Sequence, residues 1–407
     1  MGSVLEVKIR TLTPLWTGGV ARTMDRIHET GIIGSLRWWY EAIVRGLGGT
    51  ACDPSEHSCP DSSGRLCDGC VVFGTTGLKR AFQLVEWKFQ LEWKAWVNPE
   101  IDARLDVKVG SHPKHRGWFL GRGFLGEIGA SLTLLRWPQN WHPEQLIHIL
   151  HLILGFIANW GGLGPKTQQG YGVVEVELKD EQGHPRELNL QTAIEGIRRL
   201  QERIDWRGYT RKEREKLRNW PSLENFFFSK ARFSLSDPKG WIKDQAYKVS
   251  PERELSWYLK TTRPPAGVLP LAPIVRYHLR RLIRESKQNE HSVFSRDERH
   301  RLMGEQGRKS LIHVSHAYSI SEGKWELRIW GWLPDSLPEE KRVAVVNHLC
   351  SWLGIQQEGD WHTPTSGQLW TKIGLSPEEI CWFRRRIDEN AEDFLRRLLG
   401  NRGEGGS

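Results

Sequence analysis

The stretch from Pro143 to Leu178 joins a helix-forming segment to a strand through a loop that contains five glycines. Residues 143–157 are apolar on almost every face, so we expect a helix buried between a sheet and a further layer. Residues 174–178 alternate apolar with acidic side chains, which predicts a strand with one face in water. A helix that is covered on all sides requires at least two packed layers around it.

The order of predicted elements points to a specific arrangement of these layers. Period-two and helical patterns in the first half predict β, α, β, β, α, β, with Ser35 as the cap of the first helix. This order matches the split βαβ or ferredoxin-like arrangement. The predicted elements cover residues 5–9, 35–47, 85–93, 130–135, 143–157 and 174–178.

The first five elements of this order, β, α, β, β, α, are predicted a second time, although the two halves show no sequence self-similarity. We expect a closing helix from Ser376, where a proline and two glutamates follow a capping serine. The chain of 407 residues is also longer than a single core usually serves. The second set comprises strands at 226–235, 310–316 and 325–330 and helices at 272–284 and 341–353.

These patterns predict an α+β fold of two ferredoxin-like domains in tandem. The first domain covers residues 1–180 and includes a cysteine-rich insertion and the glycine-rich loop. A charged helical linker covers residues 181–224, and the second domain with its closing helix covers residues 225–402.

The composition indicates a basic chain that is rich in tryptophan. Lys and Arg number 58 against 49 Asp and Glu, which gives a net charge of +9. This excess favours a polyanionic partner, although a merely soluble basic surface has the same composition. The 21 Trp residues can fill cores or stack on unpaired bases.

The opening residues have no apolar stretch behind a charged head, as a signal peptide would. The longest apolar region, Leu146–Trp160, is shorter than the roughly 20 residues that a membrane span needs. We therefore expect a cytoplasmic protein without a membrane partner.

The glycine-rich loop, Gly161–Gly172, does not match the nucleotide-binding motifs. Pro165 stands where a Walker loop needs glycine, and the order helix then strand is reversed, so we expect no nucleotide cofactor. Such a loop can offer backbone amides to an RNA phosphate, or it can be a connection without a ligand. The candidate RNA-binding residues in it are Gly162, Gly164, Lys166, Gln168 and Gln169.

Four cysteines lie close together in a polar segment with C-x6-C-x7-C-x2-C spacing: Cys52, Cys59, Cys67 and Cys70. Four thiolates suit a closed tetrahedral zinc site, and the final C-x2-C is a usual chelating pair. The first two spacings are longer than usual, and His57 is an alternative ligand. Free or partly disulfide-bonded thiols are the other interpretation. Cys350 and Cys381 lie in predicted helices and are expected to be packing residues.

Two groups of basic residues lie on predicted helices. Arg276, Arg280 and Arg284 follow at four-residue spacing, a like-charge stripe that an RNA, an acidic neighbour or salt would relieve. Arg37 and Arg45 present the same choice, because Glu41 can pair with either. We include Arg37, Trp38, Arg45, Arg276 and Arg280 among the candidate RNA-binding residues.

Several motifs resemble a known family of CRISPR proteins. The glycine-rich loop resembles the signature of the RAMP superfamily. The segments Thr13–Gly19, Gly34–Ala42 and Cys70–Gly77 look like the first subunit of Cmr complexes, in the same order, and the second half resembles it more loosely.

The resemblance implies two RRM-like domains in a type III-B effector, near the 3′ end of the guide RNA. The implied partners are guide and target RNA and other Cmr subunits, and RNA cleavage belongs to a different subunit. We therefore predict a non-catalytic RNA-binding subunit that contributes to antiviral defence.

The loop between the first strand and the first helix adds Arg22, Arg26 and His28 as candidate phosphate contacts. His28 is also the best candidate for a general base. A metal-independent endoribonuclease that processes CRISPR RNA is therefore one alternative function, and a purely structural protein adaptor is another.

Overall fold

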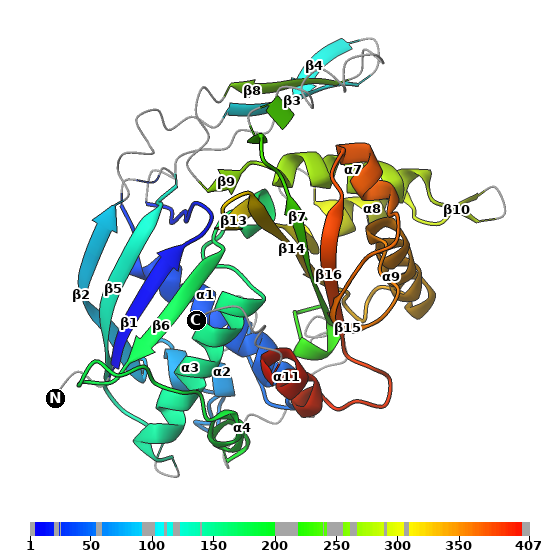
Figure 1. Cartoon of the computed structure of the whole chain (residues 1–407). Coiled ribbons are helices and arrows are strands. Elements are labelled where there is room, and N and C mark those ends of the chain that lie inside the picture. The colour runs from blue at the N-terminus through cyan, green and yellow to red at the C-terminus, as the bar shows by residue number, and fades with distance from the viewer. Residues whose placement is uncertain are drawn as a thin grey trace.

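The computed structural model describes residues 5–19, 24, 26–53, 59–91, 102–109, 112–116, 123–138, 141–199, 219–238, 240–241, 255–260, 267–288, 291–304 and 309–400. Two antiparallel sheets with helices packed against them account for most of these residues (Figure 1). The predicted α+β class is confirmed.

The first sheet has the strand order β2-β5-β1-β6, and its paired strands are antiparallel. Buried and exposed residues alternate along β1, as its period-two sequence predicts. Helices α1 and α3 bury one face of the sheet in a shared core. This order is that of the ferredoxin-like arrangement. The elements are β1 (Leu5–Thr11), α1 (Glu29–Gly46), β2 (Phe82–Leu91), β5 (Gly126–Leu134), α3 (Pro143–Asn159) and β6 (Val174–Lys179).

The first helix begins six residues before the predicted start. Its N-cap is His28, and Ser35 lies inside the helix, so the predicted serine cap is wrong. The Ser35 hydroxyl instead donates to the carbonyl of Gly31 at 3.1 Å. Burial of Ile32 and Ile33 in the core outweighs the low helix propensity of the glycines around them.

A bulge changes which face of β2 is buried. The pairing with β5 shifts between Val85 and Lys88, and Glu86 has a φ of 53° there. Phe82 and Leu84 are buried before the bulge, and Phe89 pairs with the buried Ile128 after it. The period-two alternation over residues 85–89 therefore does not mark one continuous face, because an extra residue moves later side chains to the opposite face.

The second sheet has the order β15-β16-β7-β14-β13-β9, with β12 also paired to β14. Strands β16, β7, β14 and β13 repeat the order of the first sheet, and helices α7 and α9 contribute to the core on one face. The elements are β7 (Phe226–Ser234), β9 (Val268–Leu269), α7 (Ala272–Glu285), α8 (Arg296–Met303), β12 (Ile312–Val314), β13 (Ala317–Ser321), β14 (Lys324–Trp332), α9 (Glu339–Leu353), β15 (Gly359–His362), α10 (Gln368–Ile373) and β16 (Pro377–Arg384).

The end of the chain corrects one prediction. Residues Pro377–Arg384 form strand β16 rather than the start of a helix, because they pair with β7 along its length. The closing helix is α11, Ala391–Gly400. Cys381 consequently lies buried on a strand, and Cys350 lies in α9 as predicted.

The remaining elements are short or lie at the edges of the two sheets. Helix α4 (Leu190–Arg198) packs on α3 and falls in the predicted linker, of which residues 200–218 lie outside the described residues. Strand β3 pairs with β8, a strand from the second half of the chain. The other elements are α2 (Asp68–Phe73), β3 (Asp102–Val109), β4 (His112–Arg116), β8 (Leu255–Lys260), β10 (Lys287–Gln288) and β11 (His291–Ser292).

Aromatic side chains fill the interface between the first helices and the second sheet. The ring centroids of Trp39 and Trp330 are 5.0 Å apart, and those of Trp38 and Trp332 are 5.4 Å apart. Trp160, after α3, lies 5.0 Å from Phe383 of β16. Such pairs contribute about 0.5–1.5 kcal/mol each beyond their burial. The aromatic face of the second sheet is therefore used for packing.

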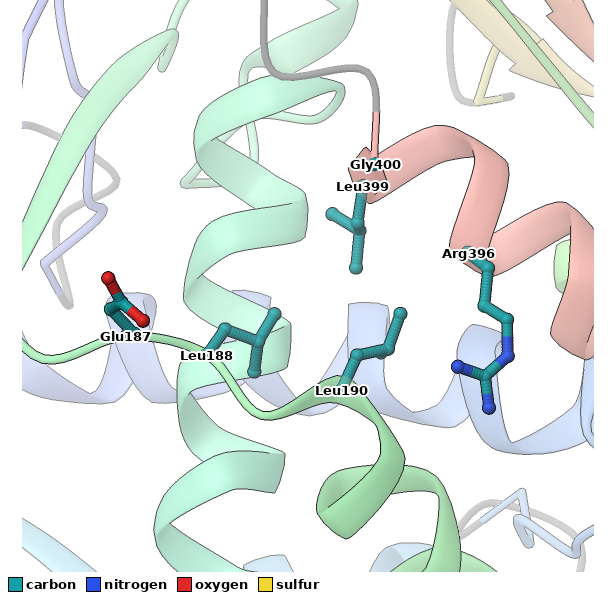
Figure 2. A pocket seen from close by; sticks show the side chains of 6 residues that line it. All are labelled: Glu187, Leu188, Leu190, Arg396, Leu399 and Gly400. Carbon is teal, nitrogen blue, oxygen red and sulfur yellow. The ribbon is translucent and has the colours of Figure 1, made fainter.

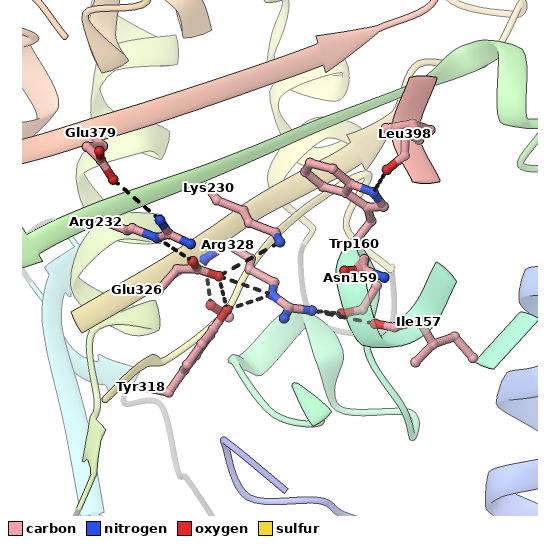
Figure 3. Close-up of polar contacts among 12 residues, drawn as sticks. Ile157, Asn159, Trp160, Lys230, Arg232, Tyr318, Glu326, Arg328, Glu379 and Leu398 are labelled. Atoms are coloured by element: carbon pink, nitrogen blue, oxygen red, sulfur yellow. Dashed lines mark hydrogen bonds and ion pairs between the residues drawn. The ribbon is translucent and has the colours of Figure 1, made fainter. Parts of the chain in front are cut away.

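The other end of the same sheet face carries a buried charged network, shown in Figure 3. The carboxylate of Glu326 accepts hydrogen bonds from Tyr318 and, at 3.0 Å, from Arg232. The Nζ of Lys230 and the Nε of Arg328 each lie 4.0 Å from it. Arg328 also points at the carbonyl of Gly161, 3.4 Å away, where the glycine-rich loop begins. The network thus joins the second sheet to the first unit.

Candidate nucleic-acid interface and cysteine cluster

The first part of the glycine-rich loop packs inward. The amide of Leu163 donates to Gly172 at 2.8 Å, and the amide of Gly172 donates to Pro14 at 2.9 Å. The amide of Gly164 donates to the Ser35 hydroxyl at 2.8 Å, and the carbonyl of Gly162 accepts from the indole of Trp39 at 3.0 Å.

Both Gly162 and Gly164 are buried. A Cβ on Gly164 would lie 2.5 Å from the carbonyl oxygen of Trp16, so glycine is needed for close packing there. The expectation that these two glycines present free amides to RNA is corrected, and their role is structural.

The second part of the loop contacts the second sheet. Thr167 shares a hydrogen bond of 3.1 Å with Nδ1 of His313, and the side-chain oxygen of Gln168 accepts from the amide of Ser310 at 3.1 Å. The amide of His316 donates to Gly170 at 2.9 Å. The side-chain oxygen of Gln169 is buried and accepts no hydrogen bond within the described residues. The loop therefore connects both units of the chain.

The histidines at this connection are neutral structural groups. Burial, followed by the charge of Arg276, lowers the pKa of His313 to about 3. Burial lowers the pKa of His316 to about 3. His313 also stacks on Trp330, with ring centroids 4.0 Å apart. Because both rings are buried, neither is placed for acid–base work on a substrate.

Lys166 is the cation that the loop leaves partly exposed. Its Nζ lies 4.3 Å from the ring centroid of Trp16 and 5.8 Å from that of Tyr171. Burial lowers the pKa of Lys166 below its ordinary value. The two rings hold the ammonium group by cation–π attraction while part of it faces solvent.

The turn before α1 lies beside the same Trp16. The hydroxyl of the buried Thr17 donates to the carbonyl of Arg26 at 3.0 Å and accepts from the amide of His28 at 2.9 Å. The Arg26 side chain is exposed, and His28 is partly exposed at the helix start. Arg22 lies outside the described residues. Arg26, His28 and Lys166 thus border one region around Trp16 and Thr17, which we call the loop surface.

The candidate residues on α1 serve packing. Arg37 and Arg45 both pair with the buried carboxylate of Glu41, at 2.8 and 3.2 Å. Arg45 also donates to the carbonyl of Pro221 at 3.1 Å, and Trp38 belongs to the aromatic interface. Spacing predicted the ion pairs correctly, but it could not show that this helix face is covered.

The predicted arginine stripe on α7 is not a solvated face. Arg276 is buried and donates to the carbonyls of Ile312, at 2.6 Å, and Met303, at 2.5 Å. Arg280 reaches Met303 as well, at 3.2 Å, but it remains exposed. We therefore exclude Arg276 from the RNA surface, and Arg280 stays a prediction. The segment around Met303 that covers α7 could not be placed from the sequence.

The cysteine cluster has the geometry of a metal site. The sulfur atoms of Cys52, Cys59, Cys67 and Cys70 all lie within 4.8 Å of one another. All four are free thiols, and the sulfurs of Cys52 and Cys70 lie 3.5 Å apart, so the disulfide alternative is not realised. Zinc–sulfur bonds of about 2.3 Å place tetrahedral sulfurs roughly 3.8 Å apart. These four residues can therefore hold a metal ion such as zinc.

Groups around the cluster suit thiolate ligands. The amides of Cys67 and Cys70 donate to the sulfurs of Cys59 and Cys67 at 3.4 and 3.3 Å, and the guanidinium of Arg37 lies 3.4 Å from the sulfur of Cys70. Such donors orient the ligands and offset their negative charge. The alternative ligand His57 lies outside the described residues.

A shallow groove lies between residues 187–190 and α11 (Figure 2). Three leucines line it, with the charged side chains of Glu187 and Arg396 at its edge. This lining contains no nucleophile with an adjacent base, so we attribute no chemistry to it. Within the described ranges, no helix combines the length and apolarity that crossing a membrane requires.

The family model described as "RAMPs: RAMP superfamily" matches residues 8–175, which include α1, α3, the glycine-rich loop and part of the first sheet. No curated protein matches the sequence significantly.

Among solved structures, the chain is similar to Cmr1 from Pyrococcus furiosus in its apo form, with 14% identity and a TM-score of 0.38 over 82% of this chain and 88% of that one. It is similar to a chain of the type III-B Cmr-beta complex bound to cognate target RNA and AMPPnP, with 12% identity and a TM-score of 0.37 over 85% and 98%. A chain of a type IV-B CRISPR complex has 16% identity and a TM-score of 0.29 over 46% and 93%.

Proposed function

We propose that the chain is a non-catalytic RNA-binding subunit of a type III-B (Cmr) CRISPR effector complex, near the 3′ end of the guide RNA. The RAMP match over residues 8–175 supports the assignment to a CRISPR system. The ordered motifs at 13–19, 34–42 and 70–77 resemble the first Cmr subunit and support the choice of subunit. Its partners are guide or target RNA and other Cmr subunits.

The observation that carries the RNA-binding role is the loop surface. Arg26 and Lys166 come from segments 140 residues apart, yet both border the Trp16–Thr17 turn. A lysine held against an aromatic ring, with an exposed arginine on the neighbouring segment, suits an RNA backbone and an adjoining base. The faces of the two sheets are less suited to RNA. The aromatic face of the second sheet is buried, and the first sheet carries ion pairs such as Arg10–Glu175.

Replacement of Arg26 or Lys166 by alanine is expected to weaken binding of single-stranded RNA and to flatten its salt dependence. Each lost phosphate contact reduces the slope of log K against log salt by about 0.7. Filter binding across a salt series measures both quantities. Lys324→Ala is the control, because that exposed lysine pairs with Glu378 and is not one of the residues of the loop surface. Slopes equal to that of the unmodified chain would contradict the assignment.

We also propose that zinc occupies the cysteine cluster and has a structural role. The cluster forms a small core separate from the two main ones, so its loss should act locally. Cys70→Ser is expected to remove about one bound zinc per chain and to expose residues 52–70 to protease. Metal analysis and limited proteolysis measure these effects. Cys350→Ser is the control, and equal zinc content in both variants would contradict the proposal.

Two other functions are separable by experiment. An endoribonuclease that uses His28 would shorten repeat RNA in a single turnover, and His28→Ala would abolish the cleavage. A structural adaptor would enter the complex without crosslinking to RNA. The burial of His313 and His316 supports the non-catalytic proposal. Burial lowers the pKa of both histidines and keeps a substrate from reaching them.

A further inference from the structure

Exposed aromatic side chains are rare in the described part of the chain, because most rings fill the two cores. Trp137 and Phe89 are the large aromatic residues exposed there, each to 45%. Phe89 stacks beside Trp87 and contacts Phe124. Trp137 follows the end of β5, with basic residues around it. It is therefore the ring best placed for an external ligand.

Two segments run side by side at this position. The amides of Leu135 and Arg136 both donate to the carbonyl of Ala81, at 2.7 and 3.1 Å. The guanidinium of Arg136 donates to the carbonyls of Lys79, at 2.7 Å, and Val71, at 2.9 Å. Residues 79–81 and 135–136 are thus held together, and the backbone that leads into Trp137 is fixed.

The surface around these segments is positively charged. Lys79 is exposed and forms no ion pair within the described residues, and Arg136 bonds only to carbonyl groups. Arg80 pairs with Glu29, the residue after His28. Three cations against one carboxylate leave a local excess of two positive charges. The Arg80–Glu29 pair also joins this surface to the start of α1.

We propose that Trp137 stacks on an unpaired RNA base while Lys79 holds the adjoining phosphate, which makes segments 79–81 and 135–137 a second single-stranded RNA contact. This inference rests on the proposed function, and it extends the RNA-binding region beyond the loop surface. An exposed indole on a fixed backbone loses little entropy on stacking, and a lysine without an acidic partner is free to neutralise a phosphate. Single-stranded RNA presents an unpaired base beside a phosphate, so it can use both features together.

The test uses the full chain and a short labelled oligouridine without secondary structure. Trp137→Ala is expected to reduce affinity about 5-fold or more, whereas Trp137→Phe retains most of it. Lys79→Ala should reduce the salt slope by about 0.7. Phe89→Ala is the matched control, because that ring is equally exposed but pairs with Ile128 near the start of β5, whereas Trp137 follows the end of β5. Ultraviolet crosslinking should recover uridine on the peptide that contains Trp137.

The outcomes separate this inference from the proposed function. If Arg26→Ala weakens binding and Trp137→Ala equals Phe89→Ala, the second contact is wrong and the RNA-binding function stands. If Trp137→Ala leaves RNA affinity unchanged but prevents assembly with other subunits, the surface binds protein and the inference is overturned. A full chain that binds no RNA would overturn both.

Discussion

Replacement of Glu326 by alanine is expected to lower the free energy of unfolding by about 3–5 kcal/mol. The carboxylate is buried and has Lys230, Arg232 and Arg328 within 4.0 Å. Removing the carboxylate leaves these three cations without a counter-charge in an interface that contains little water. An uncompensated buried charge is strongly destabilising. Denaturant unfolding followed by tryptophan fluorescence measures the change.

Glu378→Ala is the matched control for this prediction. Glu378 pairs with Lys324 at 2.6 Å, but both side chains are about half exposed. Exposed pairs contribute roughly 0–1 kcal/mol, so the control should unfold close to the unmodified chain. Equal losses in the two variants would mean that burial of the network does not matter.

The same carboxylate predicts a pH dependence. Burial alone would raise the pKa of Glu326, but Lys230, Arg328, Tyr318 and Arg232 together lower it below its ordinary value of 4.5. A carboxylate whose pKa is lower in the folded state stabilises the protein at pH values above its unfolded-state pKa. This contribution is lost as the pH falls through the folded-state pKa. The difference in Tm between the unmodified chain and Glu326→Gln should therefore be full at neutral pH and shrink below about pH 4.5. A constant difference down to pH 3 would argue against it.

Replacement of Gly172 by alanine is expected to lower the free energy of unfolding by about 3 kcal/mol or more. Gly172 has a φ of 82°, and an added Cβ would lie 1.9 Å from the carbonyl oxygen of Leu163. The overlap is with backbone, so no side-chain rotation relieves it. Because the loop contacts the second sheet, we also expect weaker packing between the two units.

Gly183→Ala separates the cost of the left-handed backbone conformation from the cost of steric overlap. Gly183 has nearly the same φ, 83°, but an added Cβ there has no neighbour within 4 Å. It should cost only the left-handed backbone conformation, about 1 kcal/mol. If Gly172→Ala costs no more than Gly183→Ala, the close packing of the glycine-rich loop is not as the structure shows it.

Local patterns predicted most of the secondary structure because burial imposes a period on the sequence. Strand β1 and helix α3 were predicted from alternation and from continuous apolar residues, and they lie where expected. The errors arose where pairing decided the outcome. Residues 377–384 carry strong helix-start signals, yet pairing with β7 makes them a strand. The bulge at Glu86 has no signal in the sequence pattern.

The candidate site was predicted less completely, because residue type does not reveal which face is covered. Cys67 and Cys70 form a recognisable chelating pair, and the two distant cysteines do join them. Arg276 has the same side chain as Arg26, but Arg276 is buried beside Met303 and Ile312 and Arg26 is exposed. Trp137 was missed because the composition gives 21 tryptophans without showing which of them are exposed. Only the fold shows that Trp137 remains exposed.

The most direct test of the RNA-binding proposal is binding of the purified full chain to labelled single-stranded guide-like RNA across a salt series, with RNA length measured before and after incubation. We predict binding that weakens steeply with salt, loses slope in Arg26→Ala and Lys166→Ala, and leaves the RNA at full length. Specific shortening of the RNA would contradict the non-catalytic assignment. Absence of salt-dependent binding would contradict the RNA-binding role itself.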